Sequence, residues 1–342
     1  MEETNVIVVG AGPVGLYLAG LLEKSGLSVR VLEEHERIGQ PSHCSGLISR
    51  NLDLFVKPKN EWIEHEVSGS LIRAGSSSVL LKKPHTAAYV IDRSRFDASL
   101  AAGLDVRLGV RVEGVSAGEA GARVDSNKGV FKADMLIGCD GANSAVAKHF
   151  GSRPKKLLMG VIGITREENY SPDVEIIIDK KAAQDGFLWK IPRGKTTEYG
   201  LFSSSADFLA LEKFFSIKPV ERRAGLIPLG PRKSYFPRTL LVGDSAGMSK
   251  PWSGGGLVYG LTAARIAART VKEAFEHGDF SEGFLERYEK GWKASFGRQI
   301  QAGMLGRRIF ENMGDFEVGL ALRGLGFFQP LADMLDMDFL VR

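Results

Sequence analysis

The sequence predicts an α/β fold: a Rossmann-like nucleotide-binding domain, interrupted by an antiparallel β-sheet and followed by a C-terminal helical segment. A glycine-rich turn stands between a buried strand and a helix at the start of the chain. Two later strands also end in glycine and an acid, and strand-like runs fill the middle of the sequence. Open α/β sheets bind ligands at the carboxyl ends of their strands, so these positions predict one shared site.

The glycine turn opens the first βαβ unit. Residues 6–9 are apolar and mostly β-branched, which is typical of a strand covered on both faces. Gly10 permits the tight turn, Gly12 lets the backbone approach a pyrophosphate, and Gly15 lets the helix pack close to the strand. Pro13 completes the turn. The pyrophosphate would meet free N–H groups at the positive end of the helix dipole.

An acid follows the second strand, which we expect over residues 27–32. Glu33 comes eighteen residues after Gly15 and can accept hydrogen bonds from an adenosine ribose. Glu34, directly after it, is a further candidate for the cofactor site. This combination of strand, glycine turn, helix and acid predicts an adenine dinucleotide, whereas the alternative is a glycine-rich turn in another kind of α/β protein.

The composition is that of an ordinary globular protein of 342 residues, with a formal net charge of +4. This charge predicts no nucleic-acid partner. The two cysteines, Cys44 and Cys139, indicate no disulfide framework and suit a reducing compartment. We find no uncharged run near the length of a membrane span and no room for a signal peptide. We therefore expect a cytoplasmic protein, and we predict no metal site.

The remaining elements follow in order from hydrophobic periodicity and glycine or proline breaks. We expect a loop at 34–49, two strands within 67–83, a strand at 87–91 with a short helix after it, a β-meander over 105–132, and a strand leading to Gly141. The middle section should hold strands at 158–165, 174–178, 186–191 and 198–203, with a helix at 207–216. A third buried strand at 238–242 is followed by helices at 257–276 and 281–296.

These elements suggest a discontinuous domain organisation. We expect a discontinuous dinucleotide-binding domain from 1–60, 86–150 and 232–300, a substrate-binding β-sheet domain from 61–85 and 151–231, and a helical segment over 301–342.

Three strand ends carry glycine or acid: the turn at 10–15, Asp140 with Gly141, and Gly243 with Asp244. A dehydrogenase that binds only NAD needs the first of them. A cofactor that is also held along a polyol chain and a ring needs the others. Taken singly, Asp140 can be a turn residue and Asp244 a helix cap, but their order along the chain favours FAD.

The third strand end has a specific use for a flavin. Asp244 can accept hydrogen bonds from ribityl hydroxyls. The helix that starts near Gly256, between Gly255 and Leu257, can offer N–H groups to the electron-rich carbonyl end of an isoalloxazine ring.

With these motifs the chain resembles the p-hydroxybenzoate hydroxylase type of FAD enzyme. Within that type, the cysteine loop at 41–49 and the segment 186–194 are similar to the geranylgeranyl reductase family, over about residues 1–310. The resemblance implies saturation of double bonds in geranylgeranyl chains, either of chlorophyll precursors or of archaeal ether lipids. After Cys44 this chain has Ser-Gly-Leu where many archaeal members have Gly-Glu-Gly, and Arg193 replaces a lysine of the second segment.

The resemblance also implies roles for individual residues. Cys44 is placed near the flavin, where it acts in proton delivery or in moving the flavin, and the alternative is a small buried hydrophobic residue. Arg93 resembles an arginine that contacts the flavin, and the alternative is a surface salt bridge. Phe187, Trp189 and Ile191 lie on one strand face and can line an apolar substrate channel, or they are ordinary sheet core.

The function expected from this resemblance is an FAD-dependent reductase, which uses a hydride from reduced flavin N5 and a proton. Its substrate would be an archaeal-type ether lipid or a prenyl diphosphate, and its electron donor ferredoxin or NAD(P)H. The alternatives are an FAD-dependent monooxygenase or hydroxylase of an apolar or aromatic substrate, and a flavin-bound regulatory or lipid-binding protein. The apolar stretch 316–328 either packs on the core or lies on a membrane as a peripheral contact.

Overall fold

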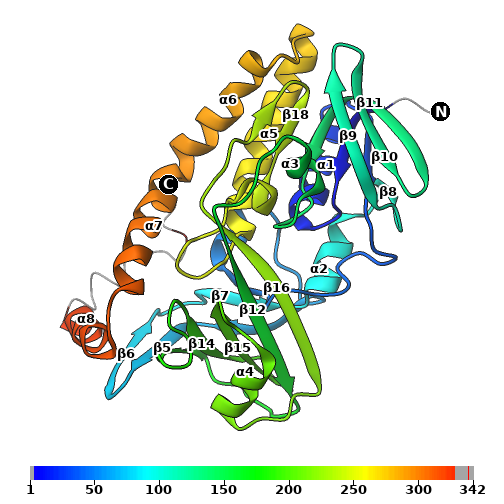
Figure 1. Cartoon of the computed structure of the whole chain (residues 1–342). Helices are drawn as coiled ribbons and strands as arrows, with labels where there is room; N and C mark the ends of the chain where they lie inside the picture. Colours follow the sequence, from blue (N-terminus) through cyan, green and yellow to red (C-terminus); the bar gives the residue numbers. More distant parts are fainter. Residues whose placement is uncertain (1–3, 328–337, 339–342) are drawn as a thin grey trace.

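The computed structural model describes residues 4–327 and residue 338. Its upper part in Figure 1 is built on a mostly parallel sheet. The elements of this part are β1 (Thr4–Val9), α1 (Pro13–Lys24), β2 (Val29–Leu32), α2 (Arg93–Leu100), β8 (Asp105–Arg107), β9 (Val112–Gly118), β10 (Gly121–Ser126), β11 (Gly129–Gly138), α3 (Ala145–His149), β17 (Tyr235–Phe236), β18 (Thr239–Leu241), η2 (Gly243–Ala246) and α5 (Leu257–His277).

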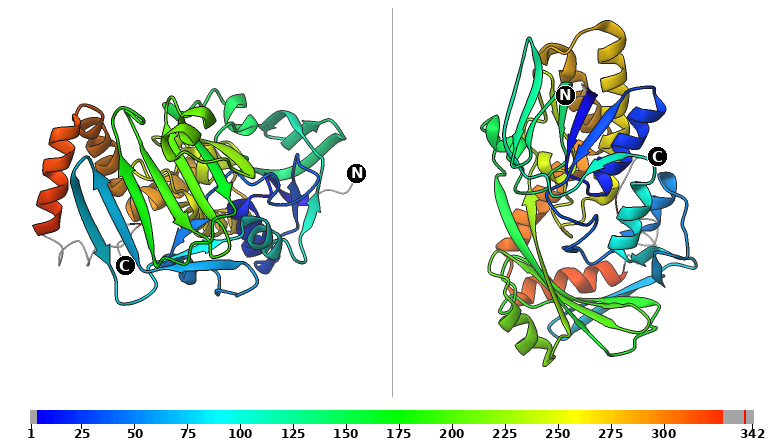
Figure 2. Two further views of the ribbon diagram at one scale, coloured as in Figure 1. Left: turned by 90° about the horizontal axis from the view of Figure 1, so that it is seen from below. Right: turned by 90° about the vertical axis from the view of Figure 1, so that its right-hand side faces the viewer.

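The strand order of this sheet is β17-β18-β11-β1-β2-β8, and β1 pairs in parallel with both β2 and β11. Its central strands are fully enclosed, as the apolar run at 6–9 predicts: Val6, Ile7 and Val8 are 0% exposed. The last strand of the expected meander and the strand before Gly141 are one element, β11, which pairs antiparallel with β10 at its start and in parallel with β1 further along. The first strand of the expected meander, β8, instead pairs in parallel with β2. The helices α1 and α5 pack together on one side of the sheet (Figure 2).

The lower part in Figure 1 is a second sheet with the order β16-β12-β15-β14-β13-β5-β6. Its elements are β5 (Gly69–Ala74), β6 (Ser77–Lys82), β12 (Lys156–Thr165), β13 (Asp173–Ile178), β14 (Phe187–Pro192), β15 (Thr197–Ser203), α4 (Phe208–Phe215) and β16 (Glu221–Leu229). Neighbouring strands are antiparallel, except that β13 and β5 pair in parallel. The edge strand β16 was not predicted, because its charged first residues hide the alternation.

A small sheet lies between these two parts. Its order is β3-β7-β4, from β3 (Leu47–Ser49), β7 (Ala88–Ile91) and β4 (Ile63–Val67), with the short helix η1 (Arg50–Leu54) after β3. The cysteine loop thus leads directly into a strand that joins the upper and lower parts.

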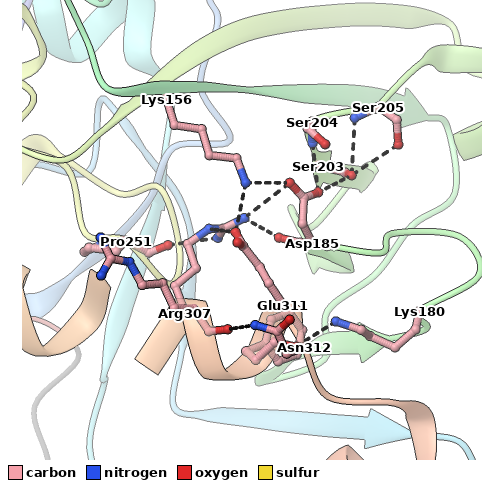
Figure 3. Close-up of polar contacts among 12 residues, drawn as sticks. Lys156, Lys180, Asp185, Ser203, Ser204, Ser205, Pro251, Arg307, Glu311 and Asn312 are labelled. Carbon is pink, nitrogen blue, oxygen red and sulfur yellow. Dashed lines mark hydrogen bonds and ion pairs between the residues drawn. The ribbon is translucent and has the colours of Figure 1, made fainter. Parts of the chain in front are cut away.

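The C-terminal helices run down one side of the molecule in Figure 1. They are α6 (Glu282–Trp292), one π-helical turn η3 (Lys293–Gly297), α7 (Arg298–Glu311) and α8 (Asp315–Phe327). Ser281 caps α6 by accepting a hydrogen bond from Phe284, as expected. A polar network ties α7 to the lower sheet (Figure 3). The predicted α/β fold with an inserted sheet and C-terminal helices is confirmed.

The apolar stretch at 316–328 includes residues that pack on the lower sheet. Val318 and Leu322 of α8 are buried against Ala74 and Val79 of the lower sheet, so the packing explanation applies to them. Its last residue, Phe328, lies outside the described residues, as does most of the predicted segment beyond it.

Within the described part of the chain, no helix combines the length and the apolar character that crossing a membrane requires.

Candidate active site

The first glycine turn leaves open space beside the start of α1. Gly10 has φ +100°, and a Cβ atom there would lie 2.5 Å from the carbonyl oxygen of Cys139. A Cβ atom at Gly15 would lie 2.2 Å from the carbonyl oxygen of Gly10. At Gly12, however, a Cβ atom would meet none of the described atoms within 4 Å. Pro13 opens α1 where a helix needs no N–H partner. This cradle fits the pyrophosphate of a dinucleotide.

The carboxylate of Glu33 lies against this turn. Its Oε2 atom accepts a hydrogen bond of 2.7 Å from the backbone N–H of Ala11. Its Oε1 atom accepts one of 3.0 Å from the backbone N–H of His35, whose ring Nδ1 lies 2.6 Å away. The predicted ribose acceptor therefore stands beside the predicted pyrophosphate cradle. Glu34 is exposed next to it.

The second strand end follows β11. Asp140 accepts a hydrogen bond of 3.1 Å from the backbone N–H of Val146 at the start of α3, so it organises a local turn as well. Burial raises the pKa of Asp140, against the hydrogen bonds from Ser144 and the α3 backbone. Gly141 has φ +72° and, like Gly12, borders space that holds none of the described atoms.

The third strand end places a buried carboxylate at the start of α5. Asp244 lies in η2, and a Cβ atom at Gly256 would come within 2.6 Å of its Oδ1 atom. Burial raises the pKa of Asp244 to about 6, although the charges of Arg93 and Arg232 oppose the shift. Such a carboxylate can accept hydrogen bonds from the hydroxyl groups of a bound polyol.

The residues before α5 form a closed loop. The backbone N–H of Lys250 donates to the carbonyl of Gly255 at 2.9 Å, and Gly256 is the N-cap without a side-chain hydrogen bond to the helix. The first N–H groups of α5, which begins at Leu257, can therefore serve a ligand.

Val14 brings the first and third loops together. A Cβ atom at Gly243 would lie 3.4 Å from Cγ1 of Val14, and one at Gly260 would lie 2.5 Å from Cγ2. The backbone of Cys139, just before Asp140, touches Gly10. Because β18, β11 and β1 are neighbours, all three strand ends meet at one edge of the sheet.

Cys44 faces a buried arginine beside this edge. Its Sγ atom accepts a hydrogen bond of 3.4 Å from the N–H of Gly46, and its side chain lies close enough to the guanidinium of Arg93 to contribute to the pKa of that residue. Arg93 is also paired with Asp97, at 2.8 and 3.0 Å. Burial alone would lower the pKa of Arg93, but the carboxylate of Asp97, together with the nearby sulfur of Cys44, outweighs burial and raises it. The Arg93 side chain is 16% exposed, so its pair with Asp97 is not a surface salt bridge.

The predicted channel residues share one face of β14 but differ in burial. Ile191 is 3% exposed and packs between the lower and the small sheet, so the sheet-core explanation applies to it. Phe187 and Trp189 are half-buried, with ring centroids 5.9 Å apart. The indole of Trp189 lies over Gly200 and donates a 2.9 Å hydrogen bond to Glu198.

Sequence reasoning missed the contacts of three cations: it noted Arg193 only as the replacement for a lysine, and no motif marks Arg232 or Lys250. Arg193 is 7% exposed and forms ion pairs with Glu198, at 2.9 Å, and with Glu64. Arg232 donates to the carbonyl of Asp244 at 3.4 Å. Lys250 pairs with Asp338 at 2.8 Å. All three depend on contacts between residues far apart in the sequence.

A cavity of about 730 Å³ lies beside the cysteine loop. It is lined by Gln40, Pro41, Ser42, His43, Glu64, Asp92, Arg93, Ser94, Arg193, Phe208, Glu221, Arg222, Arg223 and Ala224. Charged side chains make up much of its wall, and it reaches Arg93 from the side of β16.

Comparison with known proteins agrees with this geometry. The model of the FAD binding domain family matches residues 3–207, more than half of the chain. Digeranylgeranylglycerophospholipid reductase 2 of Methanopyrus kandleri is 30% identical over 99% of this chain and 92% of its own length. The chain belongs to this family of FAD-binding reductases. FAD is its cofactor.

Two further proteins resemble this chain over nearly all of its length. Digeranylgeranylglycerophospholipid reductase of Methanocaldococcus jannaschii is 26% identical over 95% of this chain and 92% of its own length. The crystal structure of a geranylgeranyl bacteriochlorophyll reductase-like protein from Thermoplasma acidophilum matches with a TM-score of 0.86 at 23% identity. That match covers 100% of this chain and 94% of the other, and it shows that the fold is shared.

Proposed function

We propose that this protein is an FAD-dependent reductase that saturates C=C bonds of geranylgeranyl chains, in archaeal-type ether lipids or prenyl diphosphates. The observation that carries the proposal is the meeting of the Gly12 cradle, the Asp244 carboxylate and the Cys44–Arg93 pair at one sheet edge. The names of the family members support the substrate class.

We assign the cofactor to the three strand ends and the cysteine loop. In this assignment Glu33 binds the adenosine ribose, Asp244 the ribityl chain, and the start of α5 the carbonyl end of the ring. The full set of residues proposed to hold FAD is Gly10, Gly12, Pro13, Gly15, Glu33, Glu34, Cys44, Arg93, Asp140, Gly141, Gly243, Asp244, Gly255, Gly256 and Leu257.

Bound, reduced FAD supplies the hydride. An isolated alkene is not polarised, so the protein must deliver a proton to the neighbouring carbon. Sγ of Cys44 holds that proton in our proposal, and the guanidinium of Arg93 stabilises the charge left on sulfur after transfer. Phe187 and Trp189, with Ile191 behind them, orient the isoprenoid chain and exclude water.

The test is anaerobic incubation of the FAD-loaded protein with geranylgeranyl ether lipid and either reduced ferredoxin or NAD(P)H, which we propose as the electron donors. Mass spectrometry should show a gain of two hydrogens per bond reduced. Cys44→Ala, reconstituted with FAD, should lose this gain. A hydroxylated product formed in air would instead indicate a monooxygenase, and bound FAD that no donor reduces would indicate a protein without turnover.

We also propose a cytoplasmic location with a peripheral membrane contact through α7 and α8. Leu305 and Ile309 of α7 are 61% and 58% exposed, and Phe316 and Leu320 of α8 are 80% and 60% exposed. Each pair is four residues apart, so each shares one face of its helix. Apolar side chains presented in this way can enter a lipid interface.

Flotation with phosphatidylglycerol vesicles tests this contact. The double variant Phe316→Ser/Leu320→Ser should float less than the parent protein. Leu209→Ser is the matched control, since Leu209 is 77% exposed on α4 instead. Equal flotation of the double variant and the parent would contradict the contact.

A further inference from the structure

The side chain of Arg193 hydrogen-bonds the cysteine loop, the small sheet and the lower sheet together. Its Nη1 atom donates to the carbonyl oxygen of Ser45 at 2.6 Å and to Glu198 at 2.9 Å. Its Nη2 atom donates to Glu64 of β4 and to the carbonyl oxygen of Ile91 at 3.4 Å. The planar fork of a guanidinium can satisfy all of these acceptors at once, which a lysine ammonium cannot do in the same geometry.

These acceptors flank the Cys44–Arg93 pair. Ser45 directly follows Cys44, and Ile91 stands two residues before Arg93. Arg193 therefore holds both backbone segments that carry the pair. A shift of either segment would change the distance from the Cys44 sulfur to the guanidinium of Arg93.

Glu198, which is paired with Arg193, connects this arginine to the residues of the predicted substrate channel. Glu198 is 0% exposed and accepts hydrogen bonds from both Arg193 and the indole of Trp189. Burial raises the pKa of Glu198, and the charge of Arg193 acts against that rise. A buried carboxylate needs a paired cation, so Glu198 and Arg193 hold each other and the indole in place.

The cysteine loop is also held on either side of Ser45. A Cβ atom at Gly225 of β16 would lie 2.7 Å from the carbonyl oxygen of His43, whose ring Nδ1 lies 2.7 Å from the carbonyl oxygen of Ala224. At Gly46 a Cβ atom would lie 2.3 Å from the carbonyl oxygen of Ile91, and the N–H of Ile91 donates to the carbonyl of Gly46 at 3.0 Å. The bond from Arg193 to Ser45 lies between these two points of contact.

We propose that Arg193 is a positioning residue, which sets the placement of Cys44 relative to Arg93 and links it to the indole of Trp189 through Glu198. Arg193 acts through these residues and is not itself catalytic. The effect of Arg193 on the turnover rate rests on the proposed reductase function, whereas its effect on the placement of the Cys44 side chain does not.

The reactivity of Cys44 provides a test that needs neither lipid nor electron donor. The chain has two cysteines, both of them half-buried, and burial raises the pKa of the Cys139 thiol. Iodoacetamide labelling followed by peptide mass spectrometry assigns each modification to its own cysteine, so it reports the labelling rate of Cys44 separately from that of Cys139. Labelling is measured at one pH, well below the melting temperature, with FAD bound and after its removal.

Arg193→Lys keeps the charge and loses the fork, so we expect faster labelling of Cys44 with FAD content unchanged. Glu198→Gln keeps a partner for the indole and removes the buried charge, and it should act in the same direction with a smaller change. Arg30→Lys is the control, because Arg30 is 12% exposed and paired with Asp105 at 2.8 Å on the strands β2 and β8. The control should label at the parent rate.

In the lipid assay, Arg193→Lys should lower kcat by about 10²-fold with a smaller change in KM, since a misplacement of about 1 Å is enough for such a loss. Unchanged Cys44 labelling in a folded Arg193→Lys protein would overturn the inference. If that variant does not fold, unchanged labelling in Glu198→Gln overturns it. Altered labelling in a protein without reductase activity would contradict the proposed function and leave the positioning role standing.

Discussion

At the scale of single residues, Asp244 shows how burial prepares a carboxylate for a ligand. The protein encloses it at the start of α5, between the charges of Arg93 and Arg232, and its pKa rises to about 6. A raised pKa means that the folded protein binds this proton more tightly than the unfolded chain does. The stability contributed by the proton is present below the ordinary pKa of 3.8 and is lost as the pH rises through 6.

The FAD-free protein should therefore lose stability between pH 4 and pH 7 through this group. The free energy of unfolding should fall by up to about 3 kcal/mol, because each pKa unit corresponds to about 1.4 kcal/mol. Urea unfolding across this pH range measures the effect. Asp244→Asn should flatten the dependence, whereas Asp125→Asn, at a carboxylate that is 46% exposed, should leave the slope unchanged.

Gly12 and Gly10 should respond differently to alanine. Gly12 has φ −71° and open space beside it, so Gly12→Ala should fold normally and weaken FAD binding by about tenfold or more, because the methyl group occupies the pyrophosphate cradle. Gly10→Ala should lower the stability even without FAD, because its methyl group meets the carbonyl of Cys139 at a strained φ. FAD titration and thermal melting of both apoproteins separate the two effects. Equal melting losses would contradict this distinction.

At the scale of elements, α7 supports the loop before α5. A Cβ atom at Gly303 would lie 3.0 Å from Pro251, and one at Gly306 would lie 2.5 Å from the ring of Trp252. The absence of side chains at these two positions of α7 therefore lets the loop pack closely against the helix. Arg307 donates to the carbonyl of Pro251 at 3.0 Å. The same side chain pairs with Glu311 at 3.0 Å and reaches the carbonyl of Asp185, as Figure 3 shows.

Arg307→Met should lower the free energy of unfolding by more than Arg308→Met does. Arg307 is 3% exposed, and Arg307→Met would leave Asp185 and Glu311 with only Lys156 as a paired cation in this network. Breaking a buried pair of this kind costs about 3–5 kcal/mol. The exposed Arg308→Met should stay within about 0.5 kcal/mol of the parent protein. Urea unfolding of both variants decides between them.

At the scale of the whole molecule, Asp338 near the C-terminus connects segments that lie far apart in the sequence. Asp338 is 1% exposed and accepts hydrogen bonds from Ser49 and Asn51, the latter at 2.9 Å. It also pairs with Lys250, and its carbonyl accepts a 2.7 Å hydrogen bond from Tyr259. The end of the chain thus joins the strand after the cysteine loop to the loop before α5.

Asp338→Ala should loosen both of these loops together. The loss of a buried partner for Lys250 should lower the free energy of unfolding by about 3 kcal/mol or more. Proteolysis in the native state should also become faster near residues 49–51 and 250–256. Asp315→Ala, at an exposed position of α8, is the control and should leave cleavage at these loops unchanged.

Local order in the sequence was sufficient for the α/β architecture, the first glycine turn and the three strand ends. Periodicity and backbone sterics act over a few residues, so Gly10, Glu33 and Asp244 could be assigned to turns before any contact was known. The edge strand β16 was missed because its charged first residues hide the alternation, and its pairing with β12 becomes visible only in the folded chain. The hydrogen bonds from Arg193 to Ser45 and from Arg232 to Asp244 were decided by tertiary packing alone. Burial and charge pairing arise only when distant segments of the chain meet.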